Sequence, residues 1–178
     1  MDIAEEPDLS ISWNPFPILV LLAFLAGCNS FDNMDVKVNE RVVFTPRPLF
    51  TDYSIVDPAL ATCVEEAIAS QRATSASELR TLRCDNAGIE NLAGLDTFTA
   101  LDRIDLRDNA IEDVAPLAAA SAVQVLLLSN NNIVNPVPLY KKPALQQLDL
   151  RGNSRLLCPD NSAFFSIEEL RLPRHCGR

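Results

Sequence analysis

The sequence predicts an α/β solenoid, in which each turn of a short coil contributes one strand to a parallel sheet. Apolar side chains recur every 22 residues between positions 79 and 172, without insertion or deletion. Within each interval they follow the spacing Leu-x-x-Leu-x-Leu-x-x-Asn-x-Ile, whose Leu-x-Leu part alternates as a strand does. One such strand cannot bury its apolar side alone, so neighbouring turns must stack. We therefore expect a right-handed coil with a parallel concave sheet.

Three columns of the repeat are apolar and are predicted to form the core. They are Leu79, Leu101, Val123, Leu145 and Ile167; Leu82, Ile104, Leu126, Leu148 and Leu170; and Cys84, Leu106, Leu128, Leu150 and Leu172. A fourth column holds Ala87 and then Asn109, Asn131 and Asn153. Buried amides must be hydrogen-bonded, so we predict that these asparagines bind backbone groups of adjacent turns and not a ligand. Ala87 has no side-chain amide, so the first turn must close in another way.

After each asparagine the chain returns along the outer side of the coil. Pro116, Pro136 and Pro138 occur in these return segments. Because proline interrupts the hydrogen bonds of a regular α-helix, we predict short 3₁₀ or extended segments there.

An amphipathic helix is predicted directly before the first turn. Asp57 and Pro58 are typical of a helix N-cap and first helical position. The apolar residues that follow lie on one helical face, and they are Leu60, Cys63, Val64, Ala67 and Ile68. We expect this helix to cover the open apolar end of the coil, as terminal caps do.

From residue 57 onward the sequence resembles the bacterial leucine-rich repeat domains of the internalin-like kind, which combine a helical N-terminal cap with 22-residue repeats. Three full repeats, a fourth and a partial fifth carry the resemblance, over about two thirds of the chain. It departs at Ala87, at Arg155 where Ile is expected, and at His175 where Asn is expected. The resemblance implies that the concave sheet is the usual binding face.

The N-terminal residues indicate export with a lipid anchor. Residues 18–27 form an uninterrupted apolar run of about ten residues, which is too short to span a bilayer but has the length of a signal-peptide core. Residues 25–28, Leu-Ala-Gly-Cys, resemble the lipobox of bacterial lipoproteins, so Cys28 is the expected lipidation site and would carry diacylglycerol and palmitate. The alternative is a buried core helix.

Two further features bear on this export signal. The segment before the apolar run contains four acids and no Lys or Arg, which departs from the positive charge of secretory signals; the acids are Asp2, Glu5, Glu6 and Asp8. Either translation starts further downstream or export is inefficient. By resemblance to Gram-negative lipoproteins, Asn29 after the cysteine points to the outer membrane, facing the periplasm or the cell surface.

These observations divide the chain into five parts. They are a lipoprotein signal peptide (1–27), a lipidated tether and extended lead-in (28–56), the cap helix and connector (57–78), the leucine-rich repeats (79–157), and a partial repeat with the C-terminal cap (158–178). Within the lead-in a period-2 pattern permits a short edge strand, at Val36, Val38, Val42 and Phe44.

The chain has five cysteines, and four are left when Cys28 carries lipid. These four permit three pairings. Cys63 on the inner face of the cap helix and Cys84 in the core of the first turn should be neighbours, so we predict that disulfide and a second between Cys158 and Cys176. Buried free thiols or a metal site are the alternatives, but the spacing fits no common zinc pattern. Paired cysteines would indicate an oxidising compartment.

The sequence offers little for catalysis. It has one histidine, near the C-terminus, and no nucleophile elbow, phosphate loop or metal-ligand helix, so we expect no enzyme activity, no cofactor and no metal site. Asp105 and Asp149 share a column, but the strand carrying Leu127 separates them by about 10 Å. The formal net charge of -9 does not indicate the excess of basic residues that is typical of nucleic-acid-binding proteins.

The outward strand positions are the candidate binding residues. They are Arg83, Arg103, Asp105, Arg107, Val125, Leu127, Gln147, Asp149, Arg151, Glu169 and Arg171. Their charges are interpreted either as solvated pairs between neighbouring strands, Arg83 beside Asp105 and Asp149 beside Arg171, worth about 0–1 kcal/mol each, or as the polar rim of an interface centred on Val125 and Leu127.

The predicted function is a lipid-anchored periplasmic module that binds an envelope protein, whose identity the sequence does not give. A structural envelope spacer without a specific partner and a surface-displayed adhesin are the alternatives. We expect a monomer.

Overall fold

The structure, a computed structural model, describes residues 36–38, 41–44, 47–160, 162–164 and 167–177. The described residues divide into two units, one before and one after the boundary between residues 48 and 49. The predicted signal peptide, the lipobox and Cys28 lie outside the described residues. Among the residues that are described, no helix combines the length and the apolar character needed to cross a membrane.

In the first unit the described backbone forms an antiparallel pair of strands. These are β1 (Val36–Val38) and β2 (Arg41–Phe44), whose register is irregular between Val36 and Lys37. Strand conformation is therefore found where the period-2 pattern permitted it.

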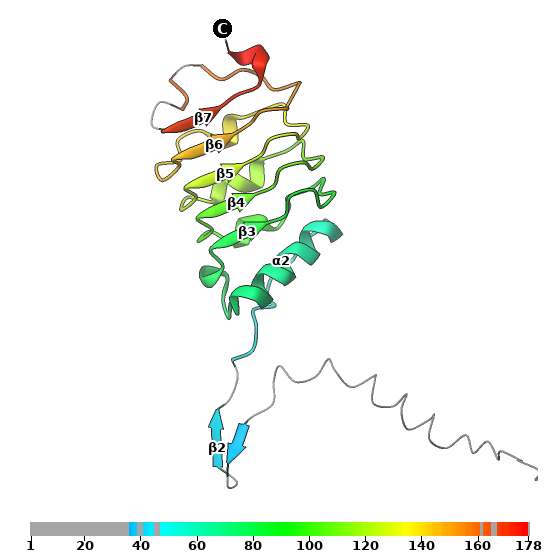
Figure 1. The fold of residues 1–178 in the computed structure, drawn as a ribbon, viewed down its shortest axis with the longest axis vertical. Helices are drawn as coiled ribbons and strands as arrows, with labels where there is room; N and C mark the ends of the chain where they lie inside the picture. The colour runs from blue at the N-terminus through cyan, green and yellow to red at the C-terminus, as the bar shows by residue number, and fades with distance from the viewer. Residues whose placement is uncertain (1–35, 39–40, 45–46, 161, 165–166, 178) are drawn as a thin grey trace, which may run out of the picture. The chain divides into compact units, whose positions relative to one another are not determined.

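The second unit contains a parallel sheet of five strands in sequential order (Figure 1). The strands are β3 (Thr81–Arg83), β4 (Arg103–Asp105), β5 (Val125–Leu127), β6 (Gln147–Asp149) and β7 (Glu169–Arg171). Each residue pairs with the residue 22 positions further along, so Leu82 pairs with Ile104 and Ile104 with Leu126. This confirms the register that the repeat predicted.

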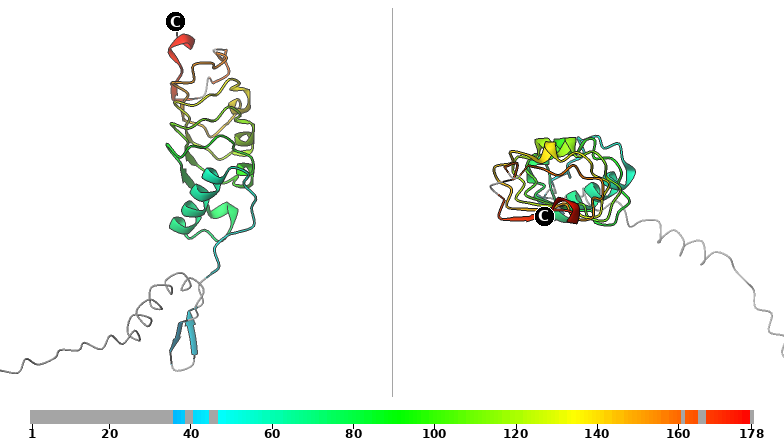
Figure 2. Two further views of the ribbon diagram at one scale, coloured as in Figure 1. Left: turned by 90° about the vertical axis from the view of Figure 1, so that its right-hand side faces the viewer. Right: turned by 90° about the horizontal axis from the view of Figure 1, so that it is seen from above.

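Short 3₁₀ helices lie on the side of the coil opposite the sheet (Figure 2). They span Leu95–Thr97, Ala115–Ala119 and Val137–Leu139. Proline lies in the first turn of the second and third, where a missing N–H costs no helical hydrogen bond. The prediction of short 3₁₀ segments is thus confirmed.

The aliphatic columns fill the space between the two sides. Leu82, Ile104, Leu126 and Leu148 are each 0% exposed, so these predicted core positions are buried. Leu170, the fifth member of that column, is 37% exposed and departs from the prediction. It lies on β7, which has a neighbouring strand on one side only.

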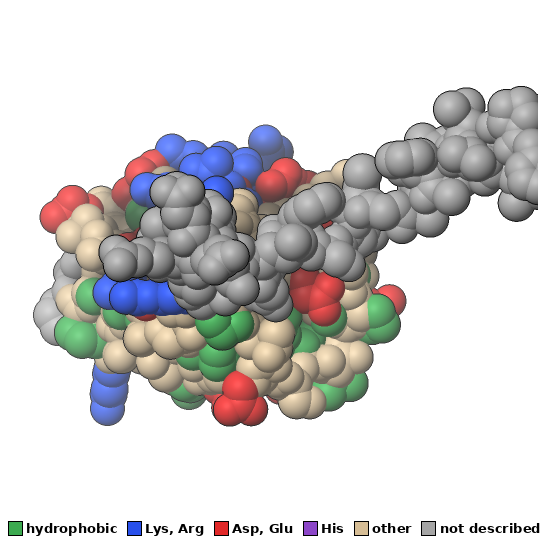
Figure 3. Space-filling view, turned by 90° about the horizontal axis from the view of Figure 1, so that it is seen from below, with side chains coloured by type: hydrophobic (Ala, Val, Ile, Leu, Met, Phe, Trp, Pro, Cys, Tyr) green, Lys and Arg blue, Asp and Glu red, His purple; other side chains and the backbone are tan. Residues whose placement is uncertain are grey.

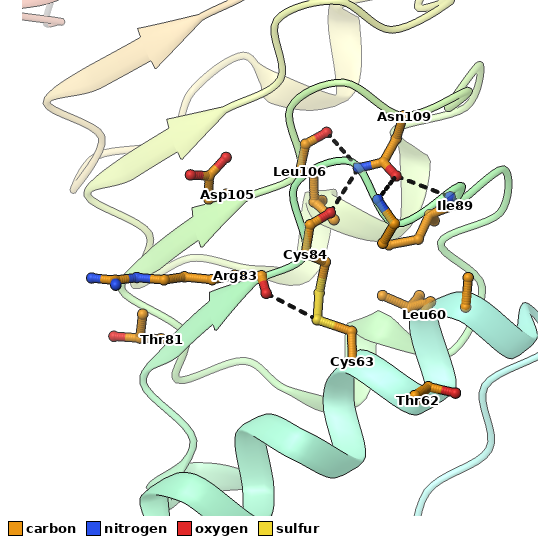
Figure 4. Close-up of a disulfide and its surroundings, with 12 residues drawn as sticks. Leu60, Thr62, Cys63, Thr81, Arg83, Cys84, Ile89, Asp105, Leu106 and Asn109 are labelled. Carbon is orange, nitrogen blue, oxygen red and sulfur yellow. Dashed lines mark hydrogen bonds between the residues drawn. A yellow bond between two sulfur atoms is a disulfide. The ribbon is translucent and has the colours of Figure 1, made fainter.

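The asparagine column joins successive turns of the coil. The Oδ1 atom of Asn131 accepts from the N–H of Ile111 at 3.0 Å, and its Nδ2 donates to the carbonyls of Leu106 and Leu128 at 2.9 and 3.1 Å. Asn109 and Asn153 repeat this pattern, and Figure 4 shows it for Asn109. The predicted structural role of these amides is confirmed.

A further column, which the sequence did not reveal, adopts positive φ angles at the position just before the column of Ala87, Asn109, Asn131 and Asn153. Its members are Asn86 (φ 53°), Asp108 (58°), Asn130 (57°) and Gly152 (77°). Asn, Asp and Gly are the residues that enter this region most readily. The Nδ2 atom of Asn130 donates to Asp108 Oδ1 at 2.7 Å. A side chain at Gly152 would place its Cβ 2.0 Å from Asn130 Oδ1, so glycine is required there.

The helix α2 (Pro58–Gln71) caps the coil, with Leu60, Cys63, Val64 and Ile68 buried. Asp57 accepts from the N–H groups of Ala59 and Leu60 through Oδ1, and from those of Glu90 and Asn91 through Oδ2. Burial acts to raise the pKa of Asp57, but these backbone donors outweigh it and the pKa lies below its ordinary value of 3.8. One carboxylate therefore starts the helix and fastens it to the first turn.

The first turn, which lacks its own asparagine, is closed from both neighbours. Asn109 of the second turn accepts from the N–H groups of Ala87 and Ile89, at 3.1 and 3.0 Å. On the other side Gln71 of α2 binds the edge of β3, donating to the carbonyl of Thr81 at 2.7 Å and accepting from its N–H at 3.2 Å. The amide of Gln71 thus occupies backbone groups that an edge strand would otherwise expose.

Residues before α2 also pack on the coil. The rings of Phe50 and Tyr53 meet that of Phe98 edge to face, with centroids 6.0 and 5.4 Å apart. Gly94 has φ +95°, and a Cβ there would lie 2.0 Å from the carbonyl oxygen of Ser54. The close approach of this segment therefore requires glycine at position 94.

The structure contains both predicted disulfides. Cys63–Cys84 joins α2 to the first turn, and Cys158–Cys176 closes the C-terminal end. The Cys63 Sγ atom lies 3.1 Å from the carbonyl oxygen of Arg83 (Figure 4), a close contact and not a hydrogen bond because oxidised sulfur has no proton. In the chain-entropy model each bridge stabilises the fold by about 3 kcal/mol.

His175 occupies the column position where asparagine was expected. Its Nε2 atom lies 3.0 Å from the carbonyl oxygen of Leu156, so the imidazole makes a hydrogen bond to the backbone of the preceding turn. The departure from the repeat pattern at this position therefore keeps a contact between turns.

We predict that Asn131→Ala lowers the free energy of unfolding by about 2 kcal/mol, because the buried N–H of Ile111 loses its acceptor and the carbonyls of Leu106 and Leu128 each lose one of two side-chain donors. The measurement is urea unfolding followed by circular dichroism. The matched control is Asn132→Ala, which removes an exposed amide with one long hydrogen bond of 3.5 Å. Equal loss in the two variants would contradict the role assigned to the Asn131 amide.

Candidate binding surface on the parallel sheet

The sheet face is the surface of β3–β7 that points away from the core. Figure 4 shows its orientation, since Arg83 and Asp105 project to one side of the sheet and Cys84 and Leu106 to the other. The predicted binding residues come together here in three rows. These are Thr81, Arg103, Val125, Gln147 and Glu169; Arg83, Asp105, Leu127, Asp149 and Arg171; and, just beyond the strands, Asp85, Arg107, Ser129, Arg151 and Pro173.

Two aspartates of the second row form ion pairs with the arginines two residues further along the chain. Arg107 donates from Nε and Nη2 to the two carboxylate oxygens of Asp105, at 2.8 and 2.7 Å. Arg151 makes the same fork to Asp149, at 3.0 and 2.6 Å. The backbone N–H of each arginine donates to the same carboxylate, at 3.3 and 3.1 Å. Each pair therefore belongs to a single turn of the coil.

The sequence predicted charge neighbours across strands, Arg83 beside Asp105 and Asp149 beside Arg171. The register places them opposite one another, as expected. The ion pairs of the two aspartates nevertheless form within one turn. The regular strands β4 and β6 end at these aspartates, so the alternation of side chains stops there and the following arginine can fold back over the carboxylate.

The structure also corrects the expectation that these aspartates are solvated. Asp105 is 8% exposed and Asp149 is 3% exposed, whereas the side chains of Arg107 and Arg151 are 42% and 54% exposed. The negative charges are thus buried beneath the positive ones. A carboxylate is stable in such a position only when it is paired and hydrogen-bonded, as both of these are.

The ionisation of the pairs follows from these contacts. Burial acts to raise the pKa of Asp149, but the hydrogen bonds from Arg151 and the charge of Arg171 outweigh it, and the pKa lies below its ordinary value of 3.8. The hydrogen bonds that the two guanidinium groups donate to the aspartates raise the pKa of both Arg107 and Arg151. Both arginines are therefore charged at any physiological pH.

An aliphatic centre lies between the two ion pairs. Val125 and Leu127 of β5 are half-buried, and Ser129 beyond them is 7% exposed. The pairs on β4 and β6 flank this strand. The sheet face therefore has an apolar centre within a charged rim, which is the general composition of a protein interface.

A polar groove of about 540 Å³ continues the sheet face at its N-terminal end. It runs between α2 and β3, and its lining residues are Cys63, Glu66, Ala67, Ser70, Gln71, Thr81 and Arg83.

A buried lysine, which the sequence analysis missed, lies away from the sheet. Lys142 is 6% exposed, and its Nζ donates to the carbonyls of Ala118 and Ala120 at 3.2 and 3.1 Å. Burial lowers the pKa of this ammonium group. Its contacts tie two turns together on the outer side of the coil, beside a mostly apolar cavity of about 690 Å³.

The described residues offer little of the chemistry that catalysis or metal binding needs. Asp105 and Asp149 are each held by an arginine, which disfavours proton transfer by either. Within the described part of the chain, Cys158, His175 and Cys176 have potential ligand atoms within 4.8 Å of one another. The two sulfur atoms form a disulfide, so neither is a thiolate ligand.

Comparison with solved structures finds similarity to internalins of Listeria monocytogenes. Internalin C2 aligns with a TM-score of 0.54 and 24% identity, over 66% of this chain and 53% of that protein. A second internalin aligns with a TM-score of 0.48 and 23% identity, over 54% of this chain and 30% of its own. No protein-family model and no curated protein matches the sequence. The likeness to internalin C2 supports the leucine-rich repeat solenoid fold.

We predict that Arg151→Gln raises the pKa of Asp149, because the buried carboxylate loses its charged partner. Because the pKa of Asp149 is lower in the folded state than its ordinary value of 3.8, this carboxylate stabilises the fold above pH 3.8. The stabilisation is lost as the pH falls through the lowered pKa. The acid-induced loss of stability should therefore be smaller in the variant. Carboxyl-carbon NMR titration measures the pKa, and urea unfolding between about pH 2 and 5 measures the stability.

The control for this titration is Arg155→Gln, since the Arg155 side chain is 70% exposed and lies 4.0 Å from the exposed Glu112. It should leave the Asp149 titration unchanged. An unaltered Asp149 pKa in Arg151→Gln would show that Arg151 does not hold that carboxylate.

Proposed function

We propose that the protein is a lipid-anchored module of the bacterial cell envelope that binds another protein through its sheet face. The observation that carries this proposal is the apolar centre of Val125 and Leu127 between two ordered Asp–Arg pairs. The repeat fold supports it, since stacked turns create an extended surface from short strands. An internalin-like fold whose described residues bring no catalytic constellation together is consistent with a binding role.

The location is proposed from the sequence and from the cysteines. The apolar run at 18–27 before Cys28 supports lipid attachment at that residue. Two disulfides are typical of a protein that folds in an oxidising compartment such as the periplasm. Asn29 after the modified cysteine favours the outer membrane. The acyl chains would fix the position of the protein, and the sheet face would recognise its partner.

We predict that Leu127→Ser removes at least nine tenths of partner capture in intact cells, because it takes the apolar centre away. Serine is preferred to aspartate, since a carboxylate at 127 would lie in the same row as Asp105 and Asp149 and repel both. Chemical crosslinking followed by mass spectrometry measures capture, and thermal unfolding confirms the fold.

The matched control for this capture experiment is Val137→Ser. Val137 is 56% exposed and lies in the 3₁₀ helix Val137–Leu139, on the opposite side of the coil. Capture should be unchanged in this variant. Equal capture by Leu127→Ser and wild type would remove the sheet face from the proposal, and the absence of any captured protein would favour a spacer without a specific partner.

We predict that cells expressing the wild-type chain incorporate labelled palmitate into it and that Cys28→Ser abolishes the label, because the thiol is the proposed acceptor. Metabolic labelling followed by immunoprecipitation measures the effect. Label retained in Cys28→Ser would contradict the anchor.

A further inference from the structure

We propose that the partner docks an acidic segment on the sheet face, with two carboxylates that flank an aliphatic side chain. The carboxylates would bind the guanidinium groups of Arg107 and Arg151, and the aliphatic side chain would lie on Val125 and Leu127. This inference rests on the proposed function and specifies the chemistry of its partner.

Within the described part of the chain, the guanidinium groups of Arg107 and Arg151 keep hydrogen-bond donors that are free for a ligand. A guanidinium group has five N–H donors. Asp105 takes Nε and one N–H of Nη2 from Arg107, and Asp149 takes the same two from Arg151. The end of each guanidinium, formed by Nη1 and the second N–H of Nη2, is left for another acceptor. A carboxylate matches the spacing of two such donors.

The two guanidinium groups are already ordered before a ligand binds. A free arginine side chain on a surface loses rotamer freedom when it binds, which weakens the complex. Arg107 and Arg151 are each already fixed by a two-pronged ion pair to a buried aspartate. Because the aspartates are 8% and 3% exposed, they position the guanidinium groups while offering little negative surface to a ligand.

The exposed charges of the sheet face are mainly positive. The chain carries a formal net charge of -9, yet arginine predominates among the exposed charges of this face. Exposed or partly exposed are Arg83, Arg103, Arg107, Arg151 and Arg171, against the acids Asp85 and Glu169. Figure 3 shows Lys and Arg side chains gathered with some acids on the side of the molecule that carries the sheet. This local excess is complementary to an acidic segment.

The spacing defines the ligand further. Arg107 and Arg151 follow β4 and β6, which are separated by one strand, so their backbones lie about 10 Å apart. Leu127 on the intervening β5 is in register with Asp105 and Asp149, over which the two guanidinium groups fold back, so it lies between the two ion pairs. A single acid would engage one guanidinium only. Two acids on either side of an aliphatic residue would engage both and cover the apolar centre.

The test uses the full-length protein purified in detergent micelles and synthetic 12-residue peptides labelled with a fluorophore. Each peptide carries one leucine between two glutamates, with the glutamates two, three, four or seven positions apart. Matched peptides carry glutamine or lysine in place of glutamate. Fluorescence polarisation measures binding. We expect at least one glutamate peptide to bind ten times more tightly than its glutamine counterpart.

The double variant R107Q/R151Q should lose this preference, and R155Q should keep it. Because the double variant leaves two buried carboxylates without their charged partners, R107K/R151K is measured beside it. Lysine keeps a positive charge near each aspartate but lacks the second pair of donors, so affinity for the glutamate peptide should fall at least fivefold while the fold is retained.

Three results would overturn the inference. The first is equal binding of glutamate and glutamine peptides, and the second is no binding of any glutamate peptide. The third is complete displacement of the peptide by inorganic phosphate when sodium chloride at the same ionic strength does not displace it, which would indicate a site for small anions. If capture in cells still depends on Leu127, the proposed function survives any of these results. Loss of both capture and peptide binding would remove the function as well.

Discussion

The structure depends on the hydrogen bonds that the asparagine amides make between successive turns. A coil bends sharply once in each turn, and the backbone groups at that bend face the interior, where water cannot reach them. Asn109, Asn131 and Asn153 supply both a donor and an acceptor at this place, so each turn completes the hydrogen bonds of the turn before it. The aliphatic columns can then stack with one fixed register, and the side chains of the sheet face fall into rows.

Other contacts close the two ends of the coil, because a terminal turn has a neighbouring turn on one side only. At the N-terminal end one carboxylate, one amide and one disulfide connect α2 to the first turn; these belong to Asp57, Gln71 and the pair Cys63–Cys84. At the C-terminal end the Cys158–Cys176 bridge and the contact of His175 with Leu156 serve the same purpose. The partial exposure of Leu170 shows that this second closure covers the core less completely.

The sequence predicted most of the repeat architecture because apolar residues recur with a fixed period and one property of the side chain defines each apolar column. The strand register, the cap helix with Asp57 as its N-cap and the Cys63–Cys84 disulfide follow from which residues share a face, and Cys158–Cys176 is the pairing that then remains. The pairing of Asp149 with Arg151 does not follow, since strand alternation applies only while the strand lasts and β6 ends at Asp149. The column of positive-φ residues was missed because Asn, Asp and Gly share a preference for positive φ angles but differ in hydropathy, which was the property that revealed the other columns.

The uniform register has a consequence for how such a surface changes in evolution. Every turn has the same length, and the closures at the two ends contact only the turns beside them. Duplication of one internal 22-residue unit would therefore widen the array by one strand, about 4.8 Å, and leave both closures undisturbed. The number of repeats sets the area of the surface that a partner can contact, whereas a few outward positions in each repeat set its chemical character. The two properties can therefore be selected separately.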